Sequence, residues 1–317
     1  MKPRSLLLIL LAAILSILVG WHQVNPRSPA AAEYPQVAPP AVDSQKLWAD
    51  VEALSFKRFE ESDRQKARDY IMQELQSAGW TPKLQEFQAQ GLSGINILAE
   101  RSGTNPQLGA ILLGAHYDTI ALSPGADDNA TGVAAVLAAA RLLGQNPTPR
   151  SLQLAFFDLE EEGLLGSQAF VETLQPDLIQ GAMIMDMIGY TCRTAGCQTY
   201  PPLPIKPPVD KGEFLAAIGD QGHPDLTQSL SQAGRGNLPQ VLTLSIPTLS
   251  GLAPDLVRSD HTPFWKKGIG AVLLTDTANF RNPHYHQPSD RLETIDRDFF
   301  VGSAQIVINA VTDLLQK

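Results

Sequence analysis

The residues best suited to chemistry follow an apolar run near the middle of the chain. Residues 156–163 read Phe-Phe-Asp-Leu-Glu-Glu-Glu-Gly, so hydrophobic side chains give way at once to carboxylates. A buried strand seldom ends in three consecutive glutamates unless a positive partner lies at its end, because desolvated carboxylates repel one another. A surface turn would give the same letters, so this run alone does not separate a functional site from a solvated turn.

Other apolar runs end in the same way. The polar residues that follow these runs are His116 and Asp118 after residues 110–115, Asp186 after residues 182–185, and the loop residues His284 and His286 after residues 271–274. Asp127 and Asp128 lie at a predicted helix start. Ligands bind outside the carboxyl ends of parallel strands. If these strands are parallel, the groups meet at one edge of a sheet.

Imidazole and carboxylate groups in similar number are typical of a zinc site, with cobalt or manganese as other possible occupants. A structural zinc site more often uses cysteines in a closed shell, whereas catalytic sites keep an open position. The residue types therefore favour a catalytic metal site.

Taken singly, the motifs have simpler explanations. His116 and Asp118 lie on the same face of an extended segment, so Asp118 could accept the far ring N–H of His116 and orient it. A lone histidine of this kind is more often structural than ligating. Asp127 or Asp128 could instead cap the helix that begins near Asn129.

The elements that must position these groups alternate between strands and helices. Helical patterns cover about 44–79, 129–143, 165–173, 225–233 and 296–315, and strand patterns cover 95–99, 110–115, 152–157, 182–185, 214–218, 241–246 and 271–274. Such alternation predicts a mostly parallel sheet. We therefore expect a single α/β domain of three layers, with helices on both faces of the sheet.

Six segments, in this order, resemble the co-catalytic zinc aminopeptidase family, which includes secreted bacterial aminopeptidases, glutamate carboxypeptidase-like enzymes and glutaminyl cyclases. The resemblance covers about residues 45–317. The segments are GAHYDT (114–119), PGADDNATG (124–132), EEEGLLGS (160–167), MDMIG (185–189), SDHTPF (259–264) and PHYHQPSD (283–290).

The resemblance implies a role for each matching residue. His116 and Asp186 would hold one zinc ion, Glu161 and His286 a second, and Asp128 would bridge the two. Glu160 would be the general base that takes a proton from a metal-bound water. His284 is a weaker alternative to His286, and Asp260 and His261 would line the pocket or begin a helix near it. Glu162 is expected to be a solvated turn residue.

The activity implied by the resemblance is that of an exopeptidase, most simply an aminopeptidase that acts on peptides with a free N-terminus. A glutaminyl cyclase is the alternative within the family, although cyclases tend to have Trp before the last histidine ligand, where this chain has Tyr285. A metal-free binding domain is a third reading, but such domains usually show broken ligand sets.

The N-terminus predicts export to the periplasm or the outside of the cell. Lys2 and Arg4 precede the apolar run 6–20, so residues 1–21 fit a signal peptide or a membrane anchor. Residues 22–44 are rich in Pro and Ala and fit a linker, which leaves 45–317 as the catalytic domain.

The bulk composition narrows the partners. The net charge of -9, without a basic stripe, argues against a nucleic-acid partner. The two cysteines, Cys192 and Cys197, are close in sequence and fit a local disulfide in an exported protein.

Overall fold

The computed structural model describes residues 37–201, 209–247 and 254–317. Within them, eight strands form one sheet in the order β1-β2-β4-β3-β5-β8-β6-β7. The strands are β1 (Lys83–Ala89), β2 (Leu92–Arg101), β3 (Ala110–His116), β4 (Leu152–Phe157), β5 (Ile179–Met185), β6 (Phe214–Asp220), β7 (Gln240–Ile246) and β8 (Ala271–Thr275).

The centre of the sheet is parallel and its flanks are mixed. Strands β4, β3, β5 and β8 run in the same direction, whereas β2 and β6 run against their neighbours β4 and β8. Every residue of β3 and β8 is buried, as expected for strands covered on both faces. The predicted α/β architecture with a mostly parallel sheet is confirmed.

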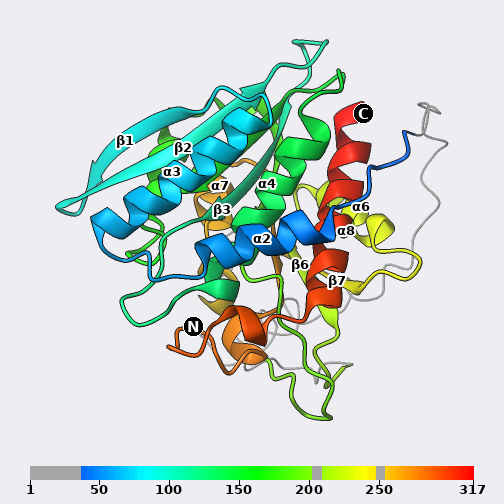
Figure 1. Ribbon diagram of the computed structural model, residues 1–317. Helices are drawn as coiled ribbons and strands as arrows, with labels where there is room; N and C mark the ends of the chain where they lie inside the picture. The colour runs from blue at the N-terminus through cyan, green and yellow to red at the C-terminus, as the bar shows by residue number, and fades with distance from the viewer. Residues whose placement is uncertain (1–36, 202–208, 248–253) are drawn as a thin grey trace, which may run out of the picture.

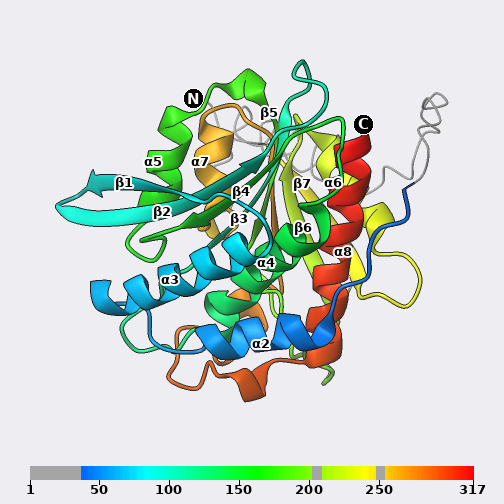
Figure 2. The same ribbon diagram turned by 45° about the horizontal axis from the view of Figure 1, so that its top comes forward.

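Helices cover both faces of this sheet (Figure 1). The described helices are α2 (Ser44–Leu54), α3 (Glu61–Ser77), α4 (Gly132–Leu143), α5 (Leu165–Thr173), α6 (Pro224–Ala233), α7 (His261–Lys266) and α8 (Arg297–Gln316). Helices α2, α3, α4, α6 and α8 share one hydrophobic core with the sheet, and α5 and α7 share the other. Figure 2 shows α5 and α7 behind the sheet and α3, α4 and α8 in front of it.

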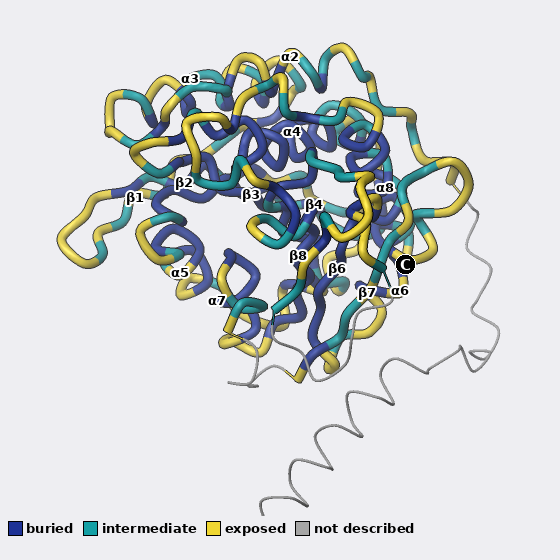
Figure 3. Tube along the Cα trace, turned by 90° about the horizontal axis from the view of Figure 1, so that it is seen from below, coloured by how far each residue is buried: buried dark blue, intermediate teal, exposed yellow. Residues whose placement is uncertain are grey.

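Helix α4 lies between the sheet and an outer layer of helices. Ten of its twelve residues are buried, and it packs against β3 on one side and against α2, α3 and α8 on the other. A helix that is apolar on nearly all sides is one that neighbours enclose. Figure 3 shows the contrast between the buried α4 and the alternately exposed turns of α2 and α3.

Two sequence predictions about elements were wrong. The helical pattern of residues 44–79 is two helices, α2 and α3, because the chain between them turns Arg58 into the interior. Strand β1 was not predicted; it is an edge strand with alternately exposed residues and a polar sequence. Gly79, the last residue of the predicted helical range, follows α3 with a φ of 85°, the left-handed conformation that ends many helices.

Helix α8 is long and apolar enough to cross a membrane by length and composition, but 72% of its apolar window is buried inside the protein. It is therefore a core helix. The predicted signal or anchor, residues 1–21, and most of the predicted linker lie outside the described residues. The last part of that linker contacts α8, since the side chain of Gln305 bonds the backbone of Val42 and Pro40.

Candidate active site

The polar residues that follow the central strands meet at one edge of the sheet, as the sequence predicted. His116 is the last residue of β3, Glu160 and Glu161 follow β4, and Asp186 follows β5. His286 lies in the long loop after β8. Because β4, β3, β5 and β8 are parallel, all four carboxyl ends face the same way.

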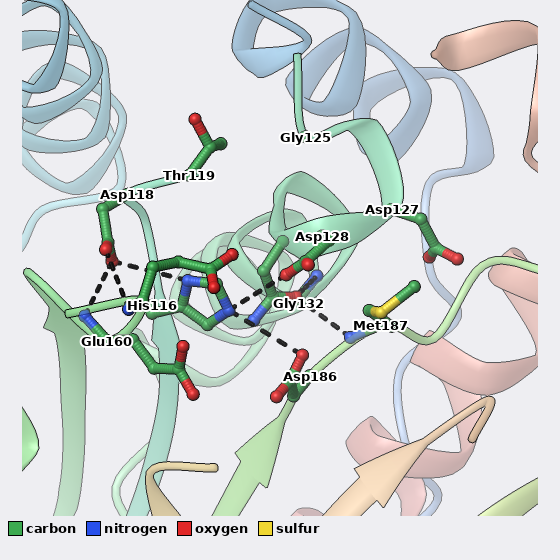
Figure 4. Close-up of polar contacts among 12 residues, drawn as sticks. His116, Asp118, Thr119, Gly125, Asp127, Asp128, Gly132, Glu160, Asp186 and Met187 are labelled. Carbon is green, nitrogen blue, oxygen red and sulfur yellow. Dashed lines mark hydrogen bonds and ion pairs between the residues drawn. The ribbon is translucent and has the colours of Figure 1, made fainter. Parts of the chain in front are cut away.

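One group of possible metal donors lies deep at this edge. It consists of His116, Glu160 and Asp186, whose donor atoms lie within 4.8 Å of one another. His116 is 1% exposed, and its Nε2 atom lies 3.7 Å from Asp186 Oδ1. Figure 4 shows the His116 ring between Asp118 on one side and Asp128 and Asp186 on the other.

A second group lies beside the first and is more open. It consists of Asp128, Glu161 and His286. His286 Nε2 lies 3.2 Å from Asp128 Oδ2 and 3.1 Å from Glu161 Oε2. The other oxygen of Asp128, Oδ1, lies 3.3 Å from Nε2 of His116, so Asp128 faces both groups.

The donor atoms of the two groups are better suited to bind a cation than to hydrogen-bond one another. Within the described residues, His286 Nε2 and Glu161 Oε1 are buried but have no hydrogen-bond partner, although carboxylate oxygens surround the histidine. Buried polar atoms without partners are rare in folded proteins. Nitrogen and oxygen donors in two adjacent groups, with the Asp128 carboxylate facing both, suit a pair of divalent ions such as zinc.

The charges of the two groups are strongly coupled. Burial alone would lower the pKa of His286, but the carboxylates of Asp128 and Glu161 raise it to about 10. Burial raises the pKa of Glu161 to about 7, and the negative charge of Asp128 adds to this effect. Burial alone would raise the pKa of Asp128, but the two nearby histidines outweigh burial and hold this pKa well below its usual value.

Asp118 positions the glutamates more than it positions His116. Its two oxygens accept the backbone N–H groups of Glu160 and Glu161, each at 3.1 Å. The predicted hydrogen bond to the far ring nitrogen of His116 is not made: Asp118 Oδ1 lies 3.5 Å from Nδ1, which has no hydrogen-bond partner. A short turn after β4 needs acceptors for its free amides, and Asp118 provides both.

Asp127 and Asp128 point in different directions, as Figure 4 shows. The Asp127 carboxylate accepts hydrogen bonds from the backbone of Gly189 and the side chain of Asn282, both at 2.9 Å. Only Asp128 faces the histidines. The helix-capping alternative fails for both, because the side chain of Asn129 accepts the Gly132 N–H at the start of α4.

Glu160 is suited to accept a proton. It is 8% exposed, and burial raises its pKa well above the usual value; attraction to His116 opposes this rise, whereas Asp260 and Glu161 add to it. A carboxyl group with a raised pKa is a stronger base than an exposed one. Glu162 is exposed, as predicted.

The remaining predicted residues lie around these groups. His284 is outside both groups and its Nδ1 bonds the Ser289 hydroxyl at 2.9 Å. His261 begins helix α7 as predicted, and Asp260 before it is buried, which raises its pKa to about 7. Cys192 and Cys197 form the predicted disulfide.

Sequence reasoning missed two supporting arginines and one carboxylate. Arg58 is fully buried and donates to the carbonyls of Tyr117, Pro124 and Gly125, which fixes the loop before Asp128.

Asp290 accepts the backbone N–H groups of Asp127 and Asp128 at 2.9 and 3.1 Å. Arg258 donates to the Tyr285 hydroxyl at 2.9 Å. Of these three residues, only Asp290 could have been found from the sequence, because it is the last residue of the family-like segment 283–290.

The chain is similar to known proteins in its sequence and in its fold. The profile of peptidase family M28 matches residues 96–311. The uncharacterized protein YfbL of Escherichia coli is 31% identical over 261 residues, 78% of each chain. The leupeptin-inactivating enzyme 1 of Streptomyces exfoliatus is 35% identical over 218 residues, which are 67% of this chain and 42% of that protein. The chain thus spans less than half of the length of the second relative.

Solved structures share the fold. A zinc aminopeptidase from Bacillus subtilis matches with a TM-score of 0.71 and 16% identity, covering 89% of this chain and 97% of that one. A glutaminyl cyclase from Porphyromonas gingivalis matches with a TM-score of 0.64 and 20% identity, covering 86% and 99%. At these identities the similarity shows a common fold, which the two activities share.

Proposed function

Because the chain belongs to peptidase family M28, we propose that it is a zinc-dependent exopeptidase, most simply an aminopeptidase that removes N-terminal residues from peptides. The observation that carries the proposal is the pair of adjacent donor groups, one containing Glu160 and the other containing Asp128, whose two oxygens face the histidines of both groups. The five proposed ligands and the proposed base all lie at one edge of the sheet.

In this proposal His116 and Asp186 would hold one zinc ion, Glu161 and His286 would hold a second, and Asp128, which faces both groups, would contribute to both. When bound, the ions supply Lewis-acid polarisation of the scissile carbonyl and a lower pKa for water. Glu160 takes a proton from the attacking water and returns it to the leaving amine. Asp118 holds the backbone of Glu160 and Glu161 so that their carboxylates face different groups.

The test uses aminoacyl-p-nitroanilides as substrates. We expect hydrolysis by the zinc-loaded protein, loss of activity after chelation and recovery on adding zinc. Hydrolysis that survives full removal of metal would contradict the proposal. Ammonia release from peptides that begin with Gln, without release of free amino acids, would identify a cyclase instead. A protein that retains no metal and shows neither activity would be a binding domain.

We also propose that the protein is exported, through residues 1–21 as a signal peptide or membrane anchor. The positive residues before the apolar run support this, and so does the disulfide between Cys192 and Cys197, since disulfides are rare in reducing compartments. Fractionation of cells that express the full chain tests the proposal; a soluble cytoplasmic protein with free thiols would exclude it.

A further inference from the structure

The two ends of the site differ in burial and in charge. The deep end contains His116, Glu160 and Asp260, which are 1%, 8% and 0% exposed. Its carboxylates suit a positively charged group such as the α-ammonium of a peptide. The other end, at His286, is more open, since this side chain is 29% exposed.

A guanidinium group borders the open end. Arg258 donates from Nη2 to the Tyr285 hydroxyl at 2.9 Å and from Nη1 to Asn279 Oδ1 at 3.2 Å. The Tyr285 ring stacks on the His286 ring, with centroids 3.8 Å apart. One aromatic ring therefore separates Arg258 from the second donor group.

These contacts orient Arg258 but leave it available. Its side chain is 47% exposed, and its nearest carboxylate, Asp255 Oδ1, lies 3.7 Å from Nη1, too far for a hydrogen bond. Its Nε has no hydrogen-bond partner among the described residues. An exposed ion pair of this length contributes little to stability, so the contact with Asp255 leaves the guanidinium able to bind another carboxylate.

A planar guanidinium held in one orientation is the group that best recognises a carboxylate, through two parallel hydrogen bonds. A short peptide carries opposite charges at its ends, and so does this site. A peptide of two residues spans roughly 7 Å when extended, so both of its charged ends can be recognised within one site.

We propose that Arg258, with Tyr285 and Asn279 as its supports, forms a subsite for a substrate carboxylate on the C-terminal side of the scissile bond. This inference rests on the proposed aminopeptidase function. The carboxylate is either the free C-terminus of a dipeptide or the acidic side chain of the second residue. Short or acidic peptides are then the preferred substrates.

The test compares kcat/KM for Leu-Gly, Leu-Gly-amide, Leu-Asp-amide and Leu-Asn-amide. For the wild type we expect a preference of roughly ten- to hundredfold for the substrate with the correctly placed carboxylate over its neutral partner, the range of a charged hydrogen bond. A preference for Leu-Gly assigns the C-terminus, and one for Leu-Asp-amide assigns the side chain. The preference should lie mainly in KM, as expected for a contact made before the chemical step.

Substitutions then locate the effect. Arg258→Gln should abolish the preference, so that kcat/KM for each acid falls to that of its neutral partner, and Arg258→Lys should retain part of the preference. Arg193→Gln is the matched control, because Arg193 is 61% exposed and pairs with Asp296 away from the donor groups. It should leave the preference unchanged, and thermal melts of all variants report whether they fold.

Three results would overturn the inference. A wild type that hydrolyses acids and amides equally has no carboxylate subsite. An Arg258→Gln variant that loses acid and amide hydrolysis in the same proportion shows that Arg258 acts on a part common to all substrates, and the Lys variant supports this reading if it loses both as well. A zinc-loaded wild type that hydrolyses none of the substrates refutes the aminopeptidase function itself, and this inference with it.

Discussion

At the scale of single residues, three adjacent glutamates have three different surroundings. Glu160 is buried beside His116, Glu161 lies with His286, and Glu162 is exposed. The difference arises because Asp118 fixes the backbone N–H groups of the first two residues. Identical side chains can therefore have separate roles within one turn.

Replacing Glu160 distinguishes a base from a ligand. Glu160→Gln should lower kcat by roughly 10²- to 10⁴-fold, because the amide cannot accept the proton of water. The zinc content, measured by mass spectrometry, should stay at the wild-type level. Glu162→Gln is the matched control and should keep full activity. Loss of zinc in Glu160→Gln would instead make Glu160 a ligand.

The residue types alone predicted the kind of site but not its members. Strand ends indicated His116 and Asp186 directly, because a buried strand must deliver its next polar residue to the sheet edge. The choices of Asp128 over Asp127 and His286 over His284 came from the family pattern. In the structure the carboxylate of Asp127 bonds Gly189 and the imidazole of His284 bonds Ser289, whereas Asp128 and His286 lie together in the second donor group. No local signal marks such long-range partners.

At the scale of elements, the loop between β3 and α4 is the part of the site held most tightly. Gly125 has a φ of 65°, and a Cβ atom there would lie 2.3 Å from Thr119 Cγ2, 2.4 Å from the Asp128 carbonyl oxygen and 2.8 Å from Arg58 Nη2. Arg58 also donates to the Gly125 carbonyl at 2.9 Å. The loop has no room for a side chain directly beside the backbone of Asp128.

Two glycine substitutions separate crowding from backbone strain. Gly125→Ala should destabilise the protein by roughly 2–5 kcal/mol, since strain of about 1–2 kcal/mol adds to overpacking of about 1–3 kcal/mol, and it should lower kcat/KM. Gly163→Ala, at a φ of 104° with no atom within 4 Å, should show only the strain and keep its activity. Urea unfolding and p-nitroanilide assays measure both. Equal losses of stability and activity in the two variants would contradict the conclusion that a side chain at position 125 is crowded.

The elements that the sequence predicted well are those with uniform surroundings. Strands β3 and β8 are apolar throughout because both faces are covered. Strand β1 escaped prediction because its solvent-facing edge selects polar residues. The break between α2 and α3 escaped because apolar periodicity continues across it, while its cause is the distant set of carbonyls that Arg58 bonds.

At the scale of the whole molecule, buried carboxyl groups make stability depend on pH. Burial raises the pKa values of Asp127, Glu161 and Asp260 to about 7, whereas in an unfolded chain they are about 4. Between about pH 4 and pH 7 the folded state therefore holds protons that the unfolded state has released. By linkage, the stability of the chelated protein must fall as pH rises through this window.

Thermal melts of the chelated protein should show this fall. We expect a lower Tm at pH 7.5 than at pH 5, and a larger rise in Tm on adding zinc at pH 7.5, where a cation takes the place of the missing protons. A chelated protein that is more stable at pH 7.5 than at pH 5, or an equal effect of zinc on Tm at both pH values, would contradict the proposed link between protonation of the buried carboxyl groups and stability.

The separation of the donors along the chain has one more consequence. The first proposed ligand is His116 and the last is His286, and they meet only when β8 has joined β5 in the sheet. Pairings between distant segments form late in folding. A nascent or partly unfolded chain thus lacks one of the three members of its second donor group. The proposed metal site can therefore form only after the sheet has closed over nearly the whole length of the domain.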